Sequence, residues 1–164
     1  MKTLTRLLAV LSAAALASCS PQTGTDSASA EPVMSSDVHP ESGLETVPLT
    51  VTSGDTTHDF TVEIATTPAE QSKGLMFRTQ LGPNEGMIFP RDPPDLASFW
   101  MKNVPIPLDI IFVGADGRII NIAAMTTPYS LDSVSSEGPT ALVLELRGGR
   151  AAELGIEAGD RVAY

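Results

Sequence analysis

The chain has 164 residues, 42% of them hydrophobic, and its formal net charge is −10 at neutral pH. Such an acidic surface repels nucleic acid and anionic lipid headgroups, so both are excluded as direct partners. About 120 residues follow the polar N-terminal part, enough for one domain with a real core but too few for two.

The first residues are typical of a secretory signal peptide. Lys2 and Arg6 precede an apolar run that covers residues 7–16. This run is too short to span a bilayer, which takes about 20 helical residues. We therefore assign residues 1–18 to a signal peptide that directs export.

Residues 16–19, Leu-Ala-Ser-Cys, resemble the bacterial lipobox. The resemblance implies cleavage before Cys19, lipidation of its thiol and attachment to a membrane through acyl chains such as palmitate. A lipidated Cys19, the only cysteine, leaves no thiol for a disulfide, a catalytic nucleophile or a cysteine-rich metal site. Ser20 resembles the residue type that permits sorting to the outer rather than the inner membrane, so we expect a lipid anchor on the periplasmic side. The alternative is an ordinary signal peptide with a stray cysteine.

The next segment, residues 20–45, is rich in Ser, Pro, Gly and acidic residues and has few large apolar side chains. Such a segment cannot bury enough surface to offset the entropy of ordering. We expect residues 19–45 to be the lipidated cysteine and a disordered acidic tether, and residues 46–164 to be a single globular β domain.

Residues 48–53 and 59–65 alternate apolar and polar side chains, which predicts a β-hairpin. Thr67, Pro68 and Glu70 then give the N-cap, first-turn proline and capping-box acid of a short helix, which ends at Gly74.

Short strands are expected at 87–89 and 98–103, around a loop at 90–96. A second hairpin is expected over 108–123, with its turn at Asp116 and Gly117. Another strand at 141–147, a helical turn at 149–154 and a last strand at 160–164 complete the domain. The fold class is mainly β: a compact antiparallel β-barrel or sandwich with two short helices.

Five residues are candidates for a ligand site. Asp109 lies in an apolar strand pattern with no polar face, so its carboxylate needs a partner, for which Lys102 and Arg78 are the candidates. Trp100 and Lys102 share a strand face, which would allow a cation–π contact beside a pocket. Glu145 repeats the pattern of a carboxylate between apolar neighbours.

Several motifs in this order resemble domain-of-unknown-function family 192, whose members are small bacterial and archaeal proteins that are often exported. The motifs are GLMFR at 74–78, GMIF at 86–89, FWMKNVPIPLDIIF at 99–112, DG at 116–117, LEL at 144–146 and GIEAGD at 155–160. The resemblance implies a compact, largely β domain and brings no established activity. Val104 stands where the family usually has threonine.

We interpret the chain as a non-enzymatic binding or interaction module for an unknown envelope ligand or protein, with no catalytic residue, cofactor or metal. The same charged residues could instead form an internal ion network that fixes strand register. They could also serve a small hydrolase-like enzyme, with Asp109 or Glu145 as base beside Lys102 or Arg78. A Cu(I) site is a further alternative, through thioethers and Trp100. Its ligands would be Met76, Met87, Met101 and Met125.

Overall fold

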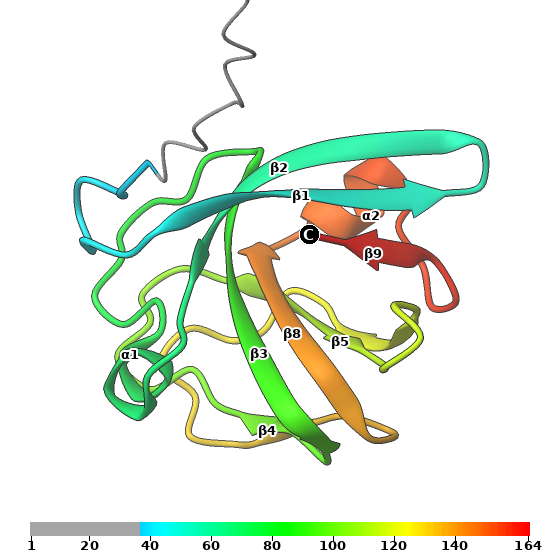
Figure 1. Ribbon diagram of the computed structural model, residues 1–164. Helices are drawn as coiled ribbons and strands as arrows, with labels where there is room; N and C mark the ends of the chain where they lie inside the picture. The colour runs from blue at the N-terminus through cyan, green and yellow to red at the C-terminus, as the bar shows by residue number, and fades with distance from the viewer. Residues whose placement is uncertain (1–36) are drawn as a thin grey trace, which may run out of the picture. The chain divides into compact units, whose positions relative to one another are not determined.

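A computed structural model describes residues 37–164; the predicted signal peptide, Cys19 and the first part of the predicted tether lie outside these residues. The described part is built on a mixed sheet of seven strands in the order β6-β5-β8-β3-β2-β1-β9, with a two-stranded sheet β4-β7 beside it (Figure 1). The strands are β1 Thr46–Ser53, β2 Thr56–Ile64, β3 Glu85–Asp95, β4 Ser98–Phe99, β5 Leu108–Val113, β6 Ile119–Ala123, β7 Val134–Ser135, β8 Thr140–Arg147 and β9 Arg161–Ala163. The helices are α1 Pro68–Lys73 and α2 Arg150–Leu154.

Helix α1 begins where the sequence predicts. The Thr67 side chain accepts a hydrogen bond from the Glu70 amide, and the Glu70 carboxylate accepts one from the Thr67 amide, so the capping box is complete. Gly74, at φ 45°, ends the helix after its single turn and a half. The helix lies in the crossover that joins β2 to β3, and this crossover makes β2 and β3 a parallel pair.

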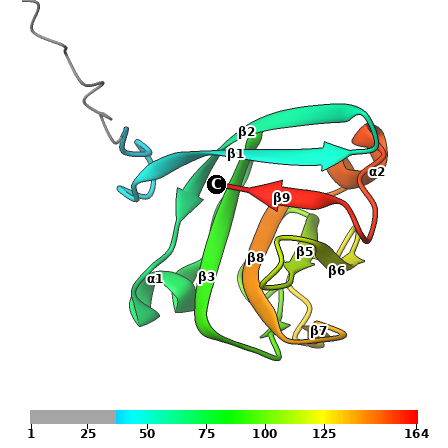
Figure 2. The same cartoon turned by 45° about the vertical axis from the view of Figure 1, so that its right-hand side comes forward.

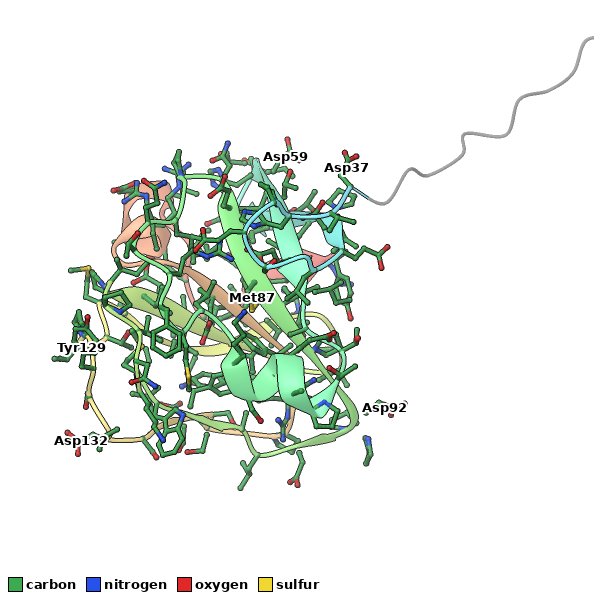
Figure 3. The ribbon with its side chains drawn as sticks, turned by 90° about the vertical axis from the view of Figure 1, so that its left-hand side faces the viewer. Asp37, Asp59, Met87, Asp92, Tyr129 and Asp132 are labelled. Atoms are coloured by element: carbon green, nitrogen blue, oxygen red, sulfur yellow. The ribbon has the colours of Figure 1, made fainter. Side chains whose placement is uncertain are left out.

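Two hydrophobic clusters cover the two faces of the sheet, because β3, β5 and β8 are apolar on both sides. Leu142, Leu144 and Leu146 of β8 join a cluster with β1, β2, β9 and α2. Val143 faces the other way, into a cluster that the loops around β4 cover. Met87 of β3 belongs to this second cluster and lies in the interior behind α1 (Figure 3). The two helices lie at opposite ends of the sheet in both ribbon views (Figures 1 and 2).

The mainly β class and the two short helices are confirmed. Of the two predicted architectures, the sandwich fits, because the sheet does not close into a barrel. Several details differ from the sequence prediction. The strand expected at 98–103 is only β4, Ser98–Phe99, so Trp100 and Lys102 lie in the loop after it, and β7 was not expected. One pair, β2 with β3, is parallel, and β3 continues to Asp95 through prolines that indicate a loop. This extension is exposed and carries only one further pairing with β8, between Asp95 and Thr140, which is how a strand tolerates proline.

Residues 37–45 were expected in the tether, yet they form a turn that is bound to the domain. The Thr46 amide donates to the Asp37 carbonyl, and the Ile64 amide donates to the Glu45 carbonyl. A β-bridge joins Val38 to Glu45. Residues 37–45 therefore belong to the domain, whose expected boundary was Thr46. No helix in residues 37–164 has the length and apolar character needed to cross a membrane.

Candidate ligand-binding cavity

Strand β8 carries Glu145 to the face of the sheet that the β4 loops cover. Side chains alternate along a strand, so Glu145 shares its face with Val143, while Leu144 and Leu146 face the other cluster. Met87 of β3 and Ile110 of β5 flank Glu145 in the sheet register. The carboxyl group is therefore set among apolar neighbours by the strand pattern itself.

Glu145 is buried and has no partner. The residue is 5% exposed, and burial raises the pKa of its carboxyl group from 4.5 to about 8. Burial is the sole cause of this shift, and within residues 37–164 no hydrogen bond or ion pair stabilises the charged form. At neutral pH the group is mostly protonated, so it can both donate and accept a hydrogen bond.

Glu145 lines a cavity of about 450 Å³, which we call the Glu145 cavity. A volume of this size is in the range of small-molecule sites. Its walls come from α1 and the turn after it, from β3, from β4 with the following loop, and from β8. The lining residues are Pro68, Gln71, Ser72, Lys73, Gly74, Leu75, Met76, Phe89, Arg91, Ser98, Phe99, Trp100, Lys102, Val104 and Glu145.

Aromatic side chains form one wall of this cavity. Phe89 and Phe99 meet edge to face with ring centroids 5.1 Å apart. Trp100 is 49% exposed, and the Lys102 ammonium lies 5.3 Å from the centroid of its ring, so the expected cation–π contact is present. The wall therefore offers an apolar surface with a cation at its edge.

Arg91 is a lining residue that sequence reasoning missed. Its Nη2 donates to the Leu96 carbonyl at 3.3 Å, whereas its buried Nε has no hydrogen-bond partner within residues 37–164. Its position in PRDPPD, among prolines and acids, indicates an exposed loop and gave no signal of a site. The parallel crossover from β2 to β3 is what brings Arg91 beside α1.

Asp109 lies away from this cavity, and the expected pairing with Lys102 or Arg78 is wrong. Its Oδ1 accepts from the Met125 and Gly149 amides, both at 2.9 Å, and its Oδ2 accepts from the Ala151 amide at 2.8 Å. These bonds satisfy a fully buried carboxylate without a cation. Asp109 therefore caps α2 from a neighbouring strand, where the N-cap residue Gly149 has no side chain to do so.

Arg78 is paired with carboxylates other than Asp109. Its guanidinium lies 2.9 Å from Glu63 Oε1, and its Nε lies 3.2 Å from the Glu41 carboxylate. Arg78 and Glu63 are both buried, and His39 lies 3.7 Å from Glu63. This cluster joins residues 37–45 to the domain. The predicted internal ion network of Arg78, Lys102, Asp109 and Glu145 does not form, and Arg78 is its only member in this cluster.

Arg78 also lines a second cavity, of about 350 Å³, on the other side of Gly74 and Met76; we call it the Arg78 cavity. The five predicted site residues thus lie in three places. Trp100, Lys102 and Glu145 line the Glu145 cavity, Arg78 lines the Arg78 cavity, and Asp109 lines neither.

The four methionines of the copper alternative lie in different environments. Met87 and Met101 are buried in the core, and the Met101 sulfur accepts a hydrogen bond from the Thr126 hydroxyl. The Met76 sulfur accepts one from the Asn103 amide, and Met125 is exposed. Within residues 37–164 no group of three or more His, Cys, Asp or Glu side chains is placed to hold a metal.

This fold and this cavity define a small mixed-β domain with a half-open ligand-sized site. Residues 49–164 match the sequence model of domain-of-unknown-function family 192, described as an uncharacterized ACR, and the chain belongs to this family. No curated protein matches the chain.

Two solved structures are similar to the domain. A protein of unknown function from Novosphingobium aromaticivorans is 58% identical at a TM-score of 0.77, with 78% of this chain and 91% of that chain covered. A protein from Sinorhizobium meliloti, described as a putative transcription regulator, is 37% identical at a TM-score of 0.70, with 72% and 92% covered. Both hydrophobic clusters and all the elements that the structure describes lie within residues 37–164, so we expect this part of the chain to fold by itself.

Proposed function

We propose that this protein is a membrane-anchored binding module of the bacterial envelope, and that its small-molecule ligand occupies the Glu145 cavity. The observation that carries the proposal is the unpartnered carboxyl group of Glu145, 5% exposed, on the wall of a ligand-sized cavity. A carboxyl group that lies among apolar neighbours and faces a cavity can hydrogen-bond to a ligand, which replaces the water that it would otherwise contact.

The geometry favours binding over the hydrolase alternative. That alternative needs Asp109 or Glu145 beside Lys102 or Arg78. The Asp109 oxygens are occupied by three amides, and Arg78 is occupied by Glu63 and Glu41. Only Glu145 and Lys102 share a cavity, and a protonated carboxylic acid is not a base at neutral pH.

Transcription regulation, the role in the description of the Sinorhizobium relative, is not part of this proposal. The net charge of −10 opposes association with a polyanion. The membrane anchor rests on the lipobox-like residues 16–19 and on Cys19 as the acylated residue. In cells that express the full chain, Cys19→Ala should abolish labelling by a fatty-acid analogue and block cleavage of the precursor. Labelling that persists would contradict the anchor.

Binding in the cavity is tested with N-phenylnaphthylamine, a neutral aromatic probe whose fluorescence rises in apolar sites. Trp100 is the only tryptophan, so energy transfer from Trp100 reports a probe held beside it. We expect residues 37–164 to bind the probe at one site with this transfer.

Helix α1 supplies a matched pair of variants for this test. Ser72 lines the Glu145 cavity and Ala69 lines the Arg78 cavity, and both are exposed. Ser72→Phe should fill the first cavity and abolish binding, whereas Ala69→Phe should leave it unchanged. Binding lost only in Ala69→Phe, binding unchanged in both variants, or no binding at all would refute the proposed site.

A further inference from the structure

We infer that the ligand of the Glu145 cavity is an anion with a flat apolar body, such as an aromatic carboxylate, because cations and aromatic rings line the cavity together. This inference rests on the proposed function and adds the chemical class of the ligand.

The charged side chains that line the Glu145 cavity favour an anion. The fixed charges on the cavity wall are the cations Lys73, Arg91 and Lys102, although the chain as a whole is strongly acidic. Salt bridges within residues 37–164 involve Arg78, Arg147 and Arg150 and none of these three cations. Three cations without carboxylate partners around one opening favour an anionic ligand.

Two hydrogen-bond donors of the Glu145 cavity also favour an anion. Arg91 is anchored at one end by the Leu96 carbonyl and keeps a buried Nε–H without a partner. Glu145, in its protonated state, adds an O–H donor deeper in the sheet face. The Arg91 Nε–H and the protonated Glu145 carboxyl group both lack an acceptor within residues 37–164, and both match the oxygens of a carboxylate, sulfonate or phosphate group.

The aromatic wall of the cavity favours a ligand with a flat ring. Phe89, Phe99 and Trp100 present ring surfaces along the same wall, and Lys102 lies at the edge of the Trp100 ring. A flat ring packs on this wall while its anionic group reaches the cations that line the same cavity. A purely inorganic anion would leave the aromatic wall uncovered.

The experiment compares two probes that share one ring system. Anilinonaphthalene sulfonate is N-phenylnaphthylamine with an added sulfonate, so the difference in their affinities isolates the anionic group. For residues 37–164 at low ionic strength, we expect the sulfonate to bind at least about tenfold more tightly, an advantage that falls as salt is added. Ser72→Phe should abolish the binding of both probes.

Charge variants locate the effect. Arg91→Gln and Lys102→Gln should each weaken the sulfonate about three- to tenfold and leave the neutral probe within about twofold. Arg161→Gln, which removes an exposed arginine on β9, is the matched control and should change neither probe.

The outcomes separate the two proposals. If the neutral probe binds in the cavity but the sulfonate binds no more tightly, or the charge variants weaken both probes equally, the ligand class is overturned and the binding function stands. If the sulfonate binds more weakly than the neutral probe, Glu145 acts as an anion and the class is also overturned. If neither probe binds, the proposed function itself fails.

Discussion

Asp109 and Glu145 are two buried carboxyl groups on neighbouring strands, and they differ in whether the fold supplies them with hydrogen bonds. In the register of β5 with β8, Asp109 lies opposite Leu146 and Glu145 lies opposite Ile110. The two side chains point to opposite faces of the sheet. Asp109 accepts three amide hydrogen bonds, whereas Glu145 has a partner in neither backbone nor side chain within residues 37–164.

The difference shows that two buried acids in one sheet can have unlike surroundings. Both groups are buried, so exposure does not distinguish them. What distinguishes them is whether the fold itself supplies donors. The amides around Asp109 tie β5 to the start of α2 and to the loop at Met125. The surroundings of Glu145 supply apolar contacts and a cavity, so under the proposed function its hydrogen bonds are made by the ligand.

The largest effect should come from removing the satisfied carboxylate. Asp109→Ala strands three amides in the interior and should lower the free energy of unfolding by about 3 to 5 kcal/mol. Asp109→Asn keeps an oxygen for the Met125 and Gly149 amides and loses the bond from Ala151, so it should cost about half as much. Urea denaturation measures both, with the exposed Asp59→Ala as control. Equal losses for Asn and Ala would show that the capping geometry is not the cause.

Glu145 should instead give a pH dependence. Its folded pKa, about 8, lies above the ordinary 4.5, so the folded state retains a proton that the unfolded state releases. Stability from this group is present below pH 4.5 and is lost as the pH rises through about 8. Between about pH 6 and pH 8 the wild type should lose about 2 kcal/mol relative to Glu145→Gln, whose side chain does not titrate.

Parallel denaturation curves of the wild type and Glu145→Gln across this range measure the effect. A constant difference between the two proteins would mean that Glu145 is ionised throughout, and the contrast with Asp109 would disappear.

The smallest effect concerns the two helix starts. Helix α1 is capped by its own Thr67, whereas α2 depends on Asp109. Thr67→Ala should cost about 1 kcal/mol, a local loss much smaller than that of Asp109→Ala. Thr79→Ala, at an exposed loop position, serves as control. A cost for Thr67→Ala as large as that for Asp109→Ala would remove the distinction between local and remote capping.

Local signals in the sequence predicted the local structure. The hairpin of β1 and β2, the capping box at Thr67, the hairpin of β5 and β6 and the end of α2 at Gly155 depend on residues close in the chain, and all are confirmed. The parallel pairing of β2 with β3 depends on where a distant strand packs, which no local pattern encodes.

The same limit applied to the candidate site: the sequence indicated which acids are buried but not which groups they contact. Apolar neighbours correctly indicated that Asp109 and Glu145 are buried, but burial does not name a partner. A signal for the partner of Asp109 did exist: the helix after Gly149 has no capping side chain of its own, and such a helix needs an acceptor from elsewhere. Arg91 and Glu63 gave no comparable signal.

The position of the two acids on opposite faces also disfavours a shifted strand register. The strands β5 and β8 are apolar on both faces, so hydrophobic residues alone would tolerate a shift by one residue. Such a shift in β5 would turn Asp109 away from its amides and toward the face that carries Met87 and Phe89. In β8 it would turn Glu145 toward the cluster that contains Leu142, Leu144 and Leu146. Each acid destabilises the shifted pairing, so the two together favour the native register at the centre of the sheet.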